Sequence, residues 1–434
     1  MHSTDTLVVV GASHAGVELS LAARQQGWLG AIILLGEESA VPYHRPPLSK
    51  AWLSGDATIE SMALRPAKAF ETNAISLRLG SRVQAIDRAA CTVQLDDGST
   101  LAYSCLALCT GGRPRELHMP GLMPNSDIAT KPANLHYLRT QADGLAIRAG
   151  LVPQARLVII GAGYIGLEVA ASARKLGATV TVLEAESRVL SRVTGPQLSA
   201  FYESVHREAG VDIRTATKVQ RIECGDGGAV QAVICADGTR IEADQLVVGV
   251  GMLPNIELAV AAGLHIDGGI VVNALSQTSD PLIVAAGDCT VHHSELYGRR
   301  IRLESVPNAL EQARAAASAL CGKPKPNHGV PWFWSDQYAL KLQMAGLSNG
   351  YDNCVLRGSV AARSFSAFYL RKGQLLAADA VNRPADFLFA KQAIVSRLVL
   401  DASALADETI SLKSLMPLPV ATPAVNASPA SGPG

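Results

Sequence analysis

The clearest pattern of apolar and polar positions runs from Leu157 to Glu184. A short apolar run predicts a buried strand, and a glycine-rich turn follows it, Gly161-Ala162-Gly163-Tyr164-Ile165-Gly166. Apolar residues then recur at helical spacing up to Lys175, and Gly177 is expected to end the helix. The β-branched run Ala178–Leu183 predicts a second strand, which an acid closes. Strand, glycine turn, helix, strand and acid in this order form the fingerprint of a dinucleotide-binding unit.

Each part of this unit has a chemical reason. The glycines allow a tight turn, a close approach of the backbone to a pyrophosphate, and close packing of helix on strand; they are Gly161, Gly163 and Gly166. The helix N-terminus, at Tyr164 and Ile165, offers free N–H groups and the positive end of a dipole to phosphates. Glu184 is placed to accept both ribose hydroxyls. Its carboxylate would repel the 2′-phosphate of NADPH, so we expect NADH.

The same pattern occurs earlier in the chain, which predicts a second dinucleotide and two related domains. A strand, Leu7–Val10, leads into a turn whose sequence is Gly11-Ala12-Ser13-His14-Ala15-Gly16. A helix is expected to run to about Gln26 and to end at Gly27, and the strand Ala31–Leu35 then leads to Glu37. Ser13 replaces the middle glycine. Its side chain is small, so we expect the approach to phosphate to be kept.

The segments after each unit repeat as well, so the duplication covers whole domains. Residues 74–110 and 211–250 each predict short strands with an Asp-Gly turn, at Gly98 and Gly238 respectively. Between them, residues 114–155 are expected to contain a helix that includes Arg139. Farther on, a strand ends in Gly287 and Asp288, and a helix is expected from Ser305 to about Leu320. Two adjacent prolines before Lys50 predict an extended or turn path.

A third region of different character begins after a linker at residues 322–326. It predicts short strands and then one helix near Ala385 to Leu398; the strands are Lys341–Met344, Cys354–Arg357, Ser366–Leu370 and Leu375–Val381. This region is α+β. From about Pro417 the chain is rich in Pro, Ala and Ser without periodicity, which predicts a disordered tail.

Composition narrows the function classes. Lysine and arginine together number 38, and so do aspartate and glutamate, so bulk charge gives no reason to expect binding to nucleic acid. No apolar run approaches the roughly 18 residues that span a bilayer, and no basic segment precedes the first strand. We therefore expect a cytoplasmic protein with no membrane partner. The eight cysteines form no Cys-x-x-Cys motif, and Cys105 and Cys109 lie in an apolar run that is typical of buried thiols.

Several separated motifs carry a family resemblance, from Leu7 to about Lys413. They are VVVGASHAGVE, RPPLSK, TGGRPR, VIIGAGYIGLEVA, AAGDC, ESVPNALEQA and PWFWSDQY. Together they resemble the FAD-dependent ferredoxin and rubredoxin reductases of oxygenase systems. Ser13 and the long Pro/Ala tail depart from the family pattern.

The resemblance implies an α/β fold with two Rossmann-like domains of the glutathione-reductase type plus a C-terminal α+β domain. It implies a discontinuous FAD-binding domain, residues 1–113 and 247–325, around an NAD-binding domain, residues 114–246. The C-terminal domain would cover residues 326–416, and the tail residues 417–434. The protein would be a monomer or a weak dimer without a metal site.

The resemblance also assigns binding roles by position. The FAD pyrophosphate would lie along Gly11–Gly16, around Ala15, with the adenosine ribose at Glu37. Lys50 would lie near the flavin N5, and other residues would line the rest of the flavin, namely Val83, Arg139, Gly287, Asp288 and Val306. NADH would lie along Gly161–Gly166 with its ribose at Glu184. Trp334 would cover the flavin ring on the side away from the nicotinamide.

Three residues are expected to carry the chemistry: Lys50, Glu168 and Trp334. The family pairs a glutamate on the second helix with the lysine near N5, which implies a buried ion pair between Glu168 and Lys50. The alternative for Glu168 is an acid of the first helical turn that stabilises the helix dipole. The alternative for Lys50 is an ordinary solvated lysine.

The implied function is an NADH-dependent reductase that takes a hydride and passes electrons singly to a [2Fe-2S] ferredoxin, which serves a cytochrome P450 or another oxygenase. Ferredoxins of this kind are usually acidic, so a basic rim is expected, with Arg314 and Lys391 as candidates. The alternative of a disulfide or peroxide reductase needs a redox cysteine early in the chain, where RPPLSK stands instead. Another acceptor, such as rubredoxin or monodehydroascorbate, and a non-enzymatic NADH-sensing flavoprotein stay open.

Overall fold

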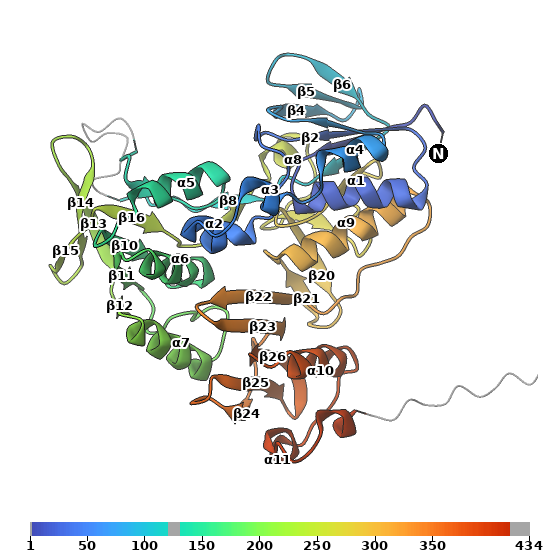
Figure 1. Ribbon diagram of the computed structural model, residues 1–434. Helices are drawn as coiled ribbons and strands as arrows, with labels where there is room; N and C mark the ends of the chain where they lie inside the picture. The colour runs from blue at the N-terminus through green and yellow to red at the C-terminus, as the bar shows by residue number, and fades with distance from the viewer. Residues whose placement is uncertain (1, 120–130, 417–434) are drawn as a thin grey trace, which may run out of the picture.

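The computed structural model describes residues 2–119 and 131–416, so the predicted tail lies outside the described residues. Figure 1 shows two lobes side by side and a third below them, which the C-terminal part of the chain forms. Each upper lobe has a parallel sheet at its centre, and the third has an antiparallel sheet. Among the described residues, no helix combines the length and the apolar character needed to cross a membrane.

The first sheet has the strand order β19-β7-β1-β2-β3, and every pairing in it is parallel. Its strands are β1 (Thr6–Val10), β2 (Ala31–Leu35), β3 (Ile75–Arg78), β7 (Cys105–Leu108) and β19 (Ile283–Ala285). Helices α1 (His14–Gln26) and α9 (Val306–Leu320) pack against each other on this sheet. As predicted, α1 ends at Gly27, whose φ of 101° favours glycine. The chain thus returns to this lobe after the second unit.

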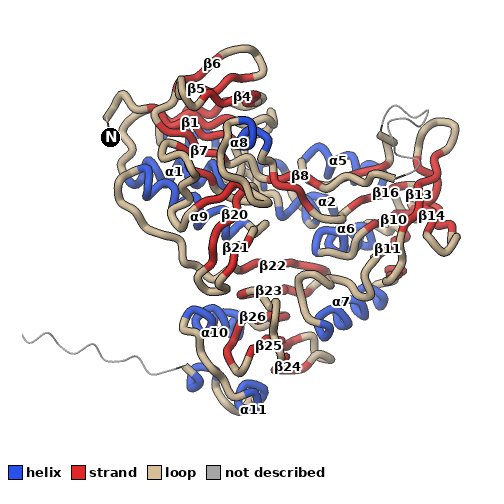
Figure 2. Tube along the Cα trace, turned by 180° about the vertical axis from the view of Figure 1, so that it is seen from behind, coloured by secondary structure: helices blue, strands red, loops and turns tan. Residues whose placement is uncertain are grey.

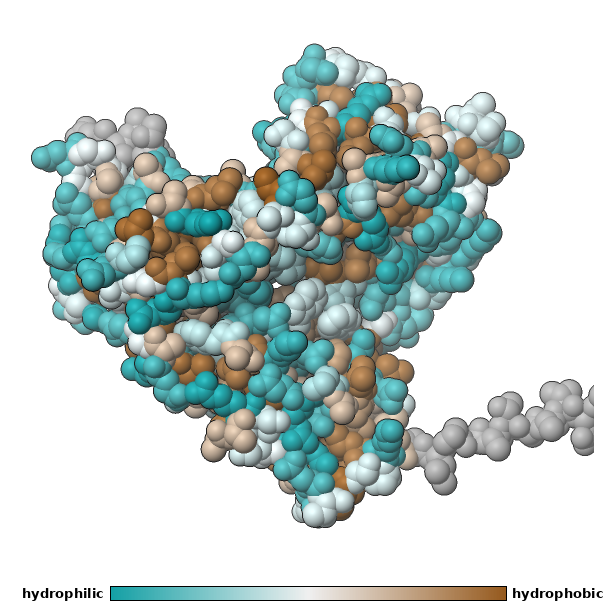
Figure 3. Space-filling model, viewed as in Figure 1, coloured by the Kyte–Doolittle hydropathy of each residue, from teal (hydrophilic) through white to brown (hydrophobic). Residues whose placement is uncertain are grey.

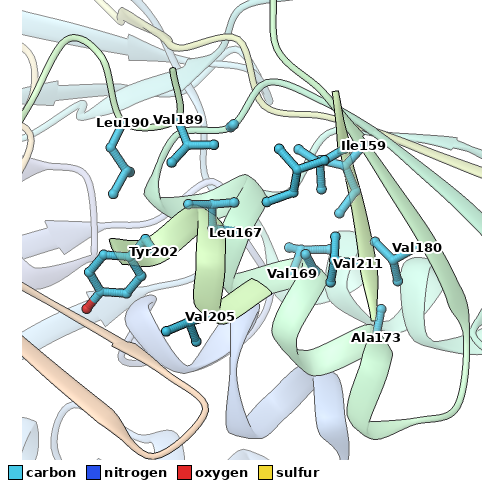
Figure 4. Close-up of a cluster of buried hydrophobic side chains, with 14 of the residues drawn as sticks. Ile159, Leu167, Val169, Ala173, Val180, Val189, Leu190, Tyr202, Val205 and Val211 are labelled. Atoms are coloured by element: carbon cyan, nitrogen blue, oxygen red, sulfur yellow. The ribbon is translucent and has the colours of Figure 1, made fainter. Parts of the chain in front are cut away.

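The second sheet repeats the plan in the order β12-β11-β10-β16-β9. Its strands are β9 (Leu135–His136), β10 (Arg156–Ile160), β11 (Thr179–Leu183), β12 (Val211–Arg214) and β16 (Gln245–Val248). Helices α6 (Tyr164–Lys175) and α7 (Pro196–Glu208) cover it. Figure 4 shows Leu167 and Val169 of α6 in the core of this lobe, with Tyr202 and Val205 of α7 nearby.

Smaller elements join and extend the two lobes. Short sheets consist of β4 (Val83–Asp87), β5 (Thr92–Leu95) and β6 (Thr100–Ala102); β13 (Val219–Cys224), β14 (Val230–Cys235) and β15 (Arg240–Glu242); β8 (Gly112–Pro114) and β17 (Met252–Pro254); β18 (Ile270–Val272), β20 (Thr290–Ser294) and β21 (Arg299–Ile301). Short helices are η1 (Pro46–Ser49), α2 (Ala51–Ser54), α3 (Ile59–Met62), α4 (Ala67–Thr72), α5 (Gln141–Gly150) and α8 (Glu257–Ala261).

The third lobe is an antiparallel sheet in the order β22-β23-β26-β25-β24. Its strands are β22 (Trp332–Gln337), β23 (Leu340–Gly346), β24 (Asn353–Ser359), β25 (Ser364–Arg371) and β26 (Gln374–Val381), and its helices are α10 (Pro384–Val395), α11 (Ala402–Ala406) and η2 (Leu412–Leu415). Figures 1 and 2 both show β22 as the strand of this sheet that faces α6. The third lobe contacts the helices α6 and α9 of the upper lobes through β22, and its strands β25 and β26 contact the start of α7 through Tyr369 and Asp379.

The predicted fold class is confirmed, as are the Asp-Gly turns, where Gly98 and Gly238 have φ of 83° and 86°. Three local expectations are wrong. Arg139 lies before α5, because Thr140 caps that helix and its hydroxyl accepts from the Asp143 N–H. The adjacent prolines open the 3₁₀ helix η1, where a missing N–H costs nothing. Glu168 lies beyond the first turn of α6, which contains no acid.

Candidate active site

A cavity of about 540 Å³ lies where the two dinucleotide units and β22 meet. The turns after β1 and β10 lie at the carboxyl ends of strands in the two parallel sheets, and residues of both turns line this cavity. Ser13 and Ala15 line it from one unit, Gly163 and Tyr164 from the other, and Trp334 from the C-terminal sheet. Figure 3 shows the surface hollowed between the two upper lobes. Its volume fits the range of cofactor and substrate sites.

Both turns depend on glycine for the same reasons. Gly11 and Gly161 have φ of +111° and +104°, and a Cβ on them would lie 2.1 Å and 2.4 Å from a carbonyl oxygen of the neighbouring strand connection. A Cβ on Gly16 or Gly166 would lie 2.0 Å and 2.1 Å from the carbonyl oxygen of the first glycine of its own turn. These four glycines let the helix start close to the strand. They shape the cavity from behind.

The cavity fits phosphate-bearing cofactors by two observations. A Cβ added to Gly163 would meet nothing within 4 Å, so the backbone there is open to a ligand. In the first turn, His14 Nε2 is buried with no hydrogen-bond partner. Burial, with His44, Arg45 and Arg139 nearby, lowers the pKa of His14 to about 3, so the ring is neutral. A bound dinucleotide can supply the partner that this nitrogen lacks in the protein.

Lys50 and Glu168 meet at the centre of the cavity wall. Lys50 Nζ lies 2.7 Å from Glu168 Oε2, and the glutamate side chain is 1% exposed. Lys50 follows η1, and Glu168 faces it from α6, so the pair joins the two lobes. Removal of either partner of an ion pair at this depth would leave the other as an uncompensated charge.

Two serine hydroxyls complete the surroundings of Glu168. Ser49 Oγ donates to Oε2 at 2.5 Å, and Ser335 Oγ of β22 donates to Oε1 at 2.6 Å. Ser172 Oγ, one turn farther along α6, donates to the Ser49 carbonyl at 2.7 Å. The carboxylate is therefore held by Ser49 of η1, by Lys50 and by Ser335 of β22, and Ser172 of α6 holds Ser49 in turn. The alternative of a solvated Lys50 beside a dipole-stabilising acid does not describe this arrangement.

Glu184 is fixed at the carboxyl end of β11. The N–H groups of Ala162 and Glu186 donate to its two carboxylate oxygens at 2.8 Å and 2.9 Å. Arg188, the nearest arginine that follows it, points elsewhere, since its guanidinium donates to the Thr194 carbonyl at 2.8 Å. Among the described residues, no arginine forms an ion pair with Glu184, and a carboxylate fixed in this way suits free ribose hydroxyls and opposes a 2′-phosphate.

Charged and aromatic groups complete the wall. Arg139 Nη2 lies 3.3 Å from Asp288 Oδ2, and burial lowers the pKa of Arg139 while Asp288 opposes that shift. Trp334 lies on the cavity wall, with its ring 5.7 Å from that of Trp332, and Lys391 Nζ lies 5.0 Å from the Trp332 ring. A row of two indoles thus leads from the cavity toward α10.

The structure brings most of the predicted residues together around this cavity. Those that line it are Ser13, Ala15, Lys50, Arg139, Gly161, Gly163, Tyr164, Ile165, Glu168, Glu184, Gly287, Asp288, Val306 and Trp334. Gly11, Gly16 and Gly166 lie behind the turns. Glu37 and Val83 do not line the cavity. Glu37 is exposed, with Arg82 Nε 3.5 Å from its carboxylate, and the Val83 side chain is 6% exposed and packs in a hydrophobic cluster of the first lobe.

Three residues of the site were missed. Ser49 and Ser335 bind Glu168, and Arg45 Nε donates to Ser13 Oγ at 3.2 Å. All three lie within two motifs of the sequence, RPPLSK and PWFWSDQY, close to the predicted site residues Lys50 and Trp334. Their position within these motifs is therefore the sequence signal that could have identified them.

Cys109 is the cysteine that lines the cavity among the described residues. Burial raises the pKa of its thiol well above the usual value, which makes it a poor nucleophile. The remaining thiols of the described residues are free as well. This arrangement gives no support to disulfide reduction.

Comparison with known proteins decides the family. The family model described as pyridine nucleotide-disulphide oxidoreductase matches residues 5–313, and one described as reductase C-terminal matches residues 332–416. The chain belongs to the pyridine nucleotide-disulphide oxidoreductase family. FAD and NADH are its cofactors, as predicted, and the resemblance read from the sequence is confirmed.

Within this family, the chain is 51% identical to putidaredoxin reductase of Pseudomonas putida over 417 residues, which cover 96% of this chain and 98% of the relative. It is 43% identical to rhodocoxin reductase of Rhodococcus erythropolis, with 94% and 93% covered. A solved covalent complex of putidaredoxin reductase with putidaredoxin matches with a TM-score of 0.91 and 51% identity, covering 95% of this chain and 98% of that chain.

Proposed function

We propose that this protein is an NADH:ferredoxin oxidoreductase. It takes a hydride from NADH and delivers electrons one at a time to a [2Fe-2S] ferredoxin that serves a cytochrome P450 or another oxygenase. The observation that carries the proposal is the single space shared by both fingerprints and Trp334. Bound FAD supplies the conversion between a two-electron donor and one-electron acceptors. The names of the relatives support ferredoxin as the acceptor.

In this proposal the residues of the second unit bind NADH. The turn Gly161–Gly166 and the first N–H groups of α6 bind the pyrophosphate, and Glu184 accepts from the ribose. Lys50 stands at the reacting centre as a cation, and Glu168 holds it there. Orientation of the donor against the acceptor is the main catalytic contribution of these groups.

The first unit and its neighbours bind FAD. Ser13 and Ala15 face its pyrophosphate, and Glu37 meets the adenosine ribose beyond the cavity, where its carboxylate is exposed beside Arg82. Val83 acts through its backbone, since its side chain is buried. The rest of the flavin contacts Arg139, Gly287, Asp288 and Val306. The proposed domains are those given by the sequence, with the FAD-binding part in two segments.

The ferredoxin docks over the row of indoles that ends at α10. Trp334 and Trp332 form the route outward, and Lys391 adds positive charge at its end. Arg314 already has a counter-ion, because its Nε lies 2.6 Å from Glu18 Oε1. We therefore assign the larger share of the electrostatic attraction to Lys391. The protein works as a monomer or weak dimer in the cytoplasm.

The test is a panel of purified acceptors. The holoenzyme with NADH should reduce at least one [2Fe-2S] ferredoxin, followed by coupled cytochrome c reduction, and rising salt should slow the reaction. Lys391→Gln should raise the KM for ferredoxin and leave flavin reduction by NADH unchanged. Rapid flavin reduction without transfer to any ferredoxin, but with transfer to rubredoxin or monodehydroascorbate, would overturn the assignment of the acceptor.

A further inference from the structure

A chain of buried polar side chains leads from Glu168 to the surface. Ser335 Oγ donates to Glu168 Oε1 at 2.6 Å, and Gln337 Nε2 lies 3.1 Å from Ser335 Oγ. Beyond it, His206 Nε2 lies 2.8 Å from Gln337 Oε1, and the Tyr338 hydroxyl lies 3.0 Å from His206 Nδ1. Ser335, Gln337 and His206 are at most 1% exposed, whereas Tyr338 is 40% exposed. The chain crosses from α6 to β22 and on to α7.

The chemistry of each member fixes the direction of every hydrogen bond. The carboxylate of Glu168 only accepts, so the hydroxyl hydrogen of Ser335 points to it and the Ser335 oxygen must accept from Gln337. The amide of Gln337 therefore turns its oxygen toward His206. Burial lowers the pKa of His206 to about 4, so its ring is neutral and has one N–H to give.

That single N–H lies on Nε2, because Nε2 faces the Gln337 oxygen, which can only accept; Nδ1 is then left to accept from the Tyr338 hydroxyl. Four hydrogen bonds thus point inward and end on Glu168 Oε1. Among the described residues, Ser335 is the donor to this oxygen, while Ser49 and Lys50 both bind Oε2. Loss of Ser335 as a donor would leave a buried, charged oxygen without a partner.

We propose that His206 and Gln337 are positioning residues for hydride transfer, because they commit Ser335 to Glu168 and so hold the Glu168–Lys50 pair in place. This inference rests on the proposed role of that pair. Without the N–H of His206, the Gln337 amide is free to turn over. Its oxygen then accepts from Ser335, and Glu168 loses the bond. The chain does not carry protons, since the Gln337 amide interrupts it.

The decisive variants change one donor each. His206→Phe keeps a ring of similar size without hydrogen bonds, and it should slow the limiting rate of flavin reduction by NADH about tenfold, or about 1.4 kcal/mol. His206→Gln retains a donor at the position of Nε2 and should recover the rate to within about threefold of the wild type. Ser335→Ala, a small change that leaves the fold intact, should be as slow as His206→Phe.

The second lobe contains a second buried histidine that serves as a matched control for His206. His136 is 6% exposed, and its Nε2 lies 2.7 Å from Gln245 Oε1, but this pair does not reach Glu168. His136→Phe therefore removes the same kind of bond and should leave the rate of flavin reduction unchanged. Stopped-flow absorbance with varied NADH separates the limiting rate from NADH binding, which His206→Phe should leave within about twofold.

A readout that does not depend on turnover is the tautomer of His206. With ¹⁵N-labelled histidine in the holoenzyme, the signal that disappears in His206→Gln should be that of a neutral, Nε2-protonated ring at pH 7. An Nδ1-protonated or charged ring would overturn the inference, as would equal rates for His206→Phe and His136→Phe. If NADH fails to reduce the wild-type flavin at all, the proposed function fails instead.

Discussion

The two dinucleotide units share one local structure and differ in what surrounds it. Each has a glutamate two residues after the last glycine of the turn, Glu18 in α1 and Glu168 in α6. Glu18 Oε1 lies 2.6 Å from Nε of Arg314 in α9. The Arg314 side chain is 59% exposed and the Glu18 side chain 14%. Glu168 lies 2.7 Å from Lys50 inside the cavity and is 1% exposed. Equivalent positions in a repeat thus carry opposite roles.

The difference comes from the third layer. Helix α1 packs against α9, which belongs to its own lobe, so its glutamate meets a surface arginine. Helix α6 packs against η1 and against β22 of the C-terminal sheet, so its glutamate meets Lys50, Ser49 and Ser335. The fingerprint sets the helix, and the neighbouring element decides whether the acid is structural or functional.

The largest effect is expected when the ion pair between Lys50 and Glu168 is broken. Lys50→Met leaves Glu168 buried without its cation, at a cost of about 3–5 kcal/mol for such pairs. We expect flavin reduction by NADH to slow by about 100-fold or more, as measured by stopped flow. Glu18→Gln is the matched control, because it breaks only the ion pairs of Glu18 with Arg314 and Arg65, which lie outside the cavity; its rate should be that of the wild type. An unchanged rate for Lys50→Met would remove Lys50 from the mechanism.

The second test concerns a contact between the second unit and the C-terminal sheet. Asp379 of β26 is fully surrounded by protein, and its Oδ2 accepts from Thr194 at 2.5 Å and from Tyr369 at 2.7 Å. Burial raises the pKa of Asp379 to about 6, from an ordinary value of 3.8. The folded protein therefore binds this proton more tightly than the unfolded chain does.

The direction in which stability changes with pH follows from this difference in proton affinity. The stability that protonated Asp379 contributes is fully present below pH 3.8 and is lost as the pH rises to about 6. Asp379→Asn keeps an acceptor oxygen and removes the titration. Above pH 6 the variant should gain on the order of 3 kcal/mol at most, and its urea midpoints should change less across this window. If the urea midpoints of the wild type and of Asp379→Asn changed with pH in parallel, Asp379 would not be the group that titrates in this window.

The two dinucleotide units and the surroundings of Glu168 show what the sequence could and could not predict. Glycine spacing and strand pattern predicted both units, and the quoted motifs pointed to Lys50, Glu168 and Trp334. The hydroxyls that bind Glu168 were not predictable, since Ser49 and Ser335 come from separate elements that only tertiary packing brings together. Local signals failed for Arg139 too, because the cap at Thr140 starts α5 later than the apolar pattern suggested.

A smaller effect is expected at the acids that close the two units. The carboxylate of Glu184 is fixed by two N–H groups, whereas Glu37 is exposed beside Arg82. Glu184→Ala removes an acceptor for the ribose and the repulsion of a 2′-phosphate, so the ratio of kcat/KM for NADH to that for NADPH should fall by about tenfold. Glu37→Ala should leave this ratio unchanged. A wild-type enzyme with equal efficiency for both coenzymes would disprove the role of Glu184.

The smallest effect is expected where the two turns themselves differ. Ser13 lines the cavity, and Arg45 Nε, at 3.2 Å, is the partner of its hydroxyl among the residues that the structure describes, so Ser13→Gly should change the dissociation constant for FAD by less than about threefold. The reverse exchange, Gly163→Ser, should be equally mild, because the φ of Gly163 is −77°, which any residue can adopt, and the first unit already carries a serine, Ser13, at the equivalent position. FAD titration of the apoprotein measures the first and NADH titration the second. A tenfold change in either would mean that the middle position of the turn, and not the elements packed around it, distinguishes the two units.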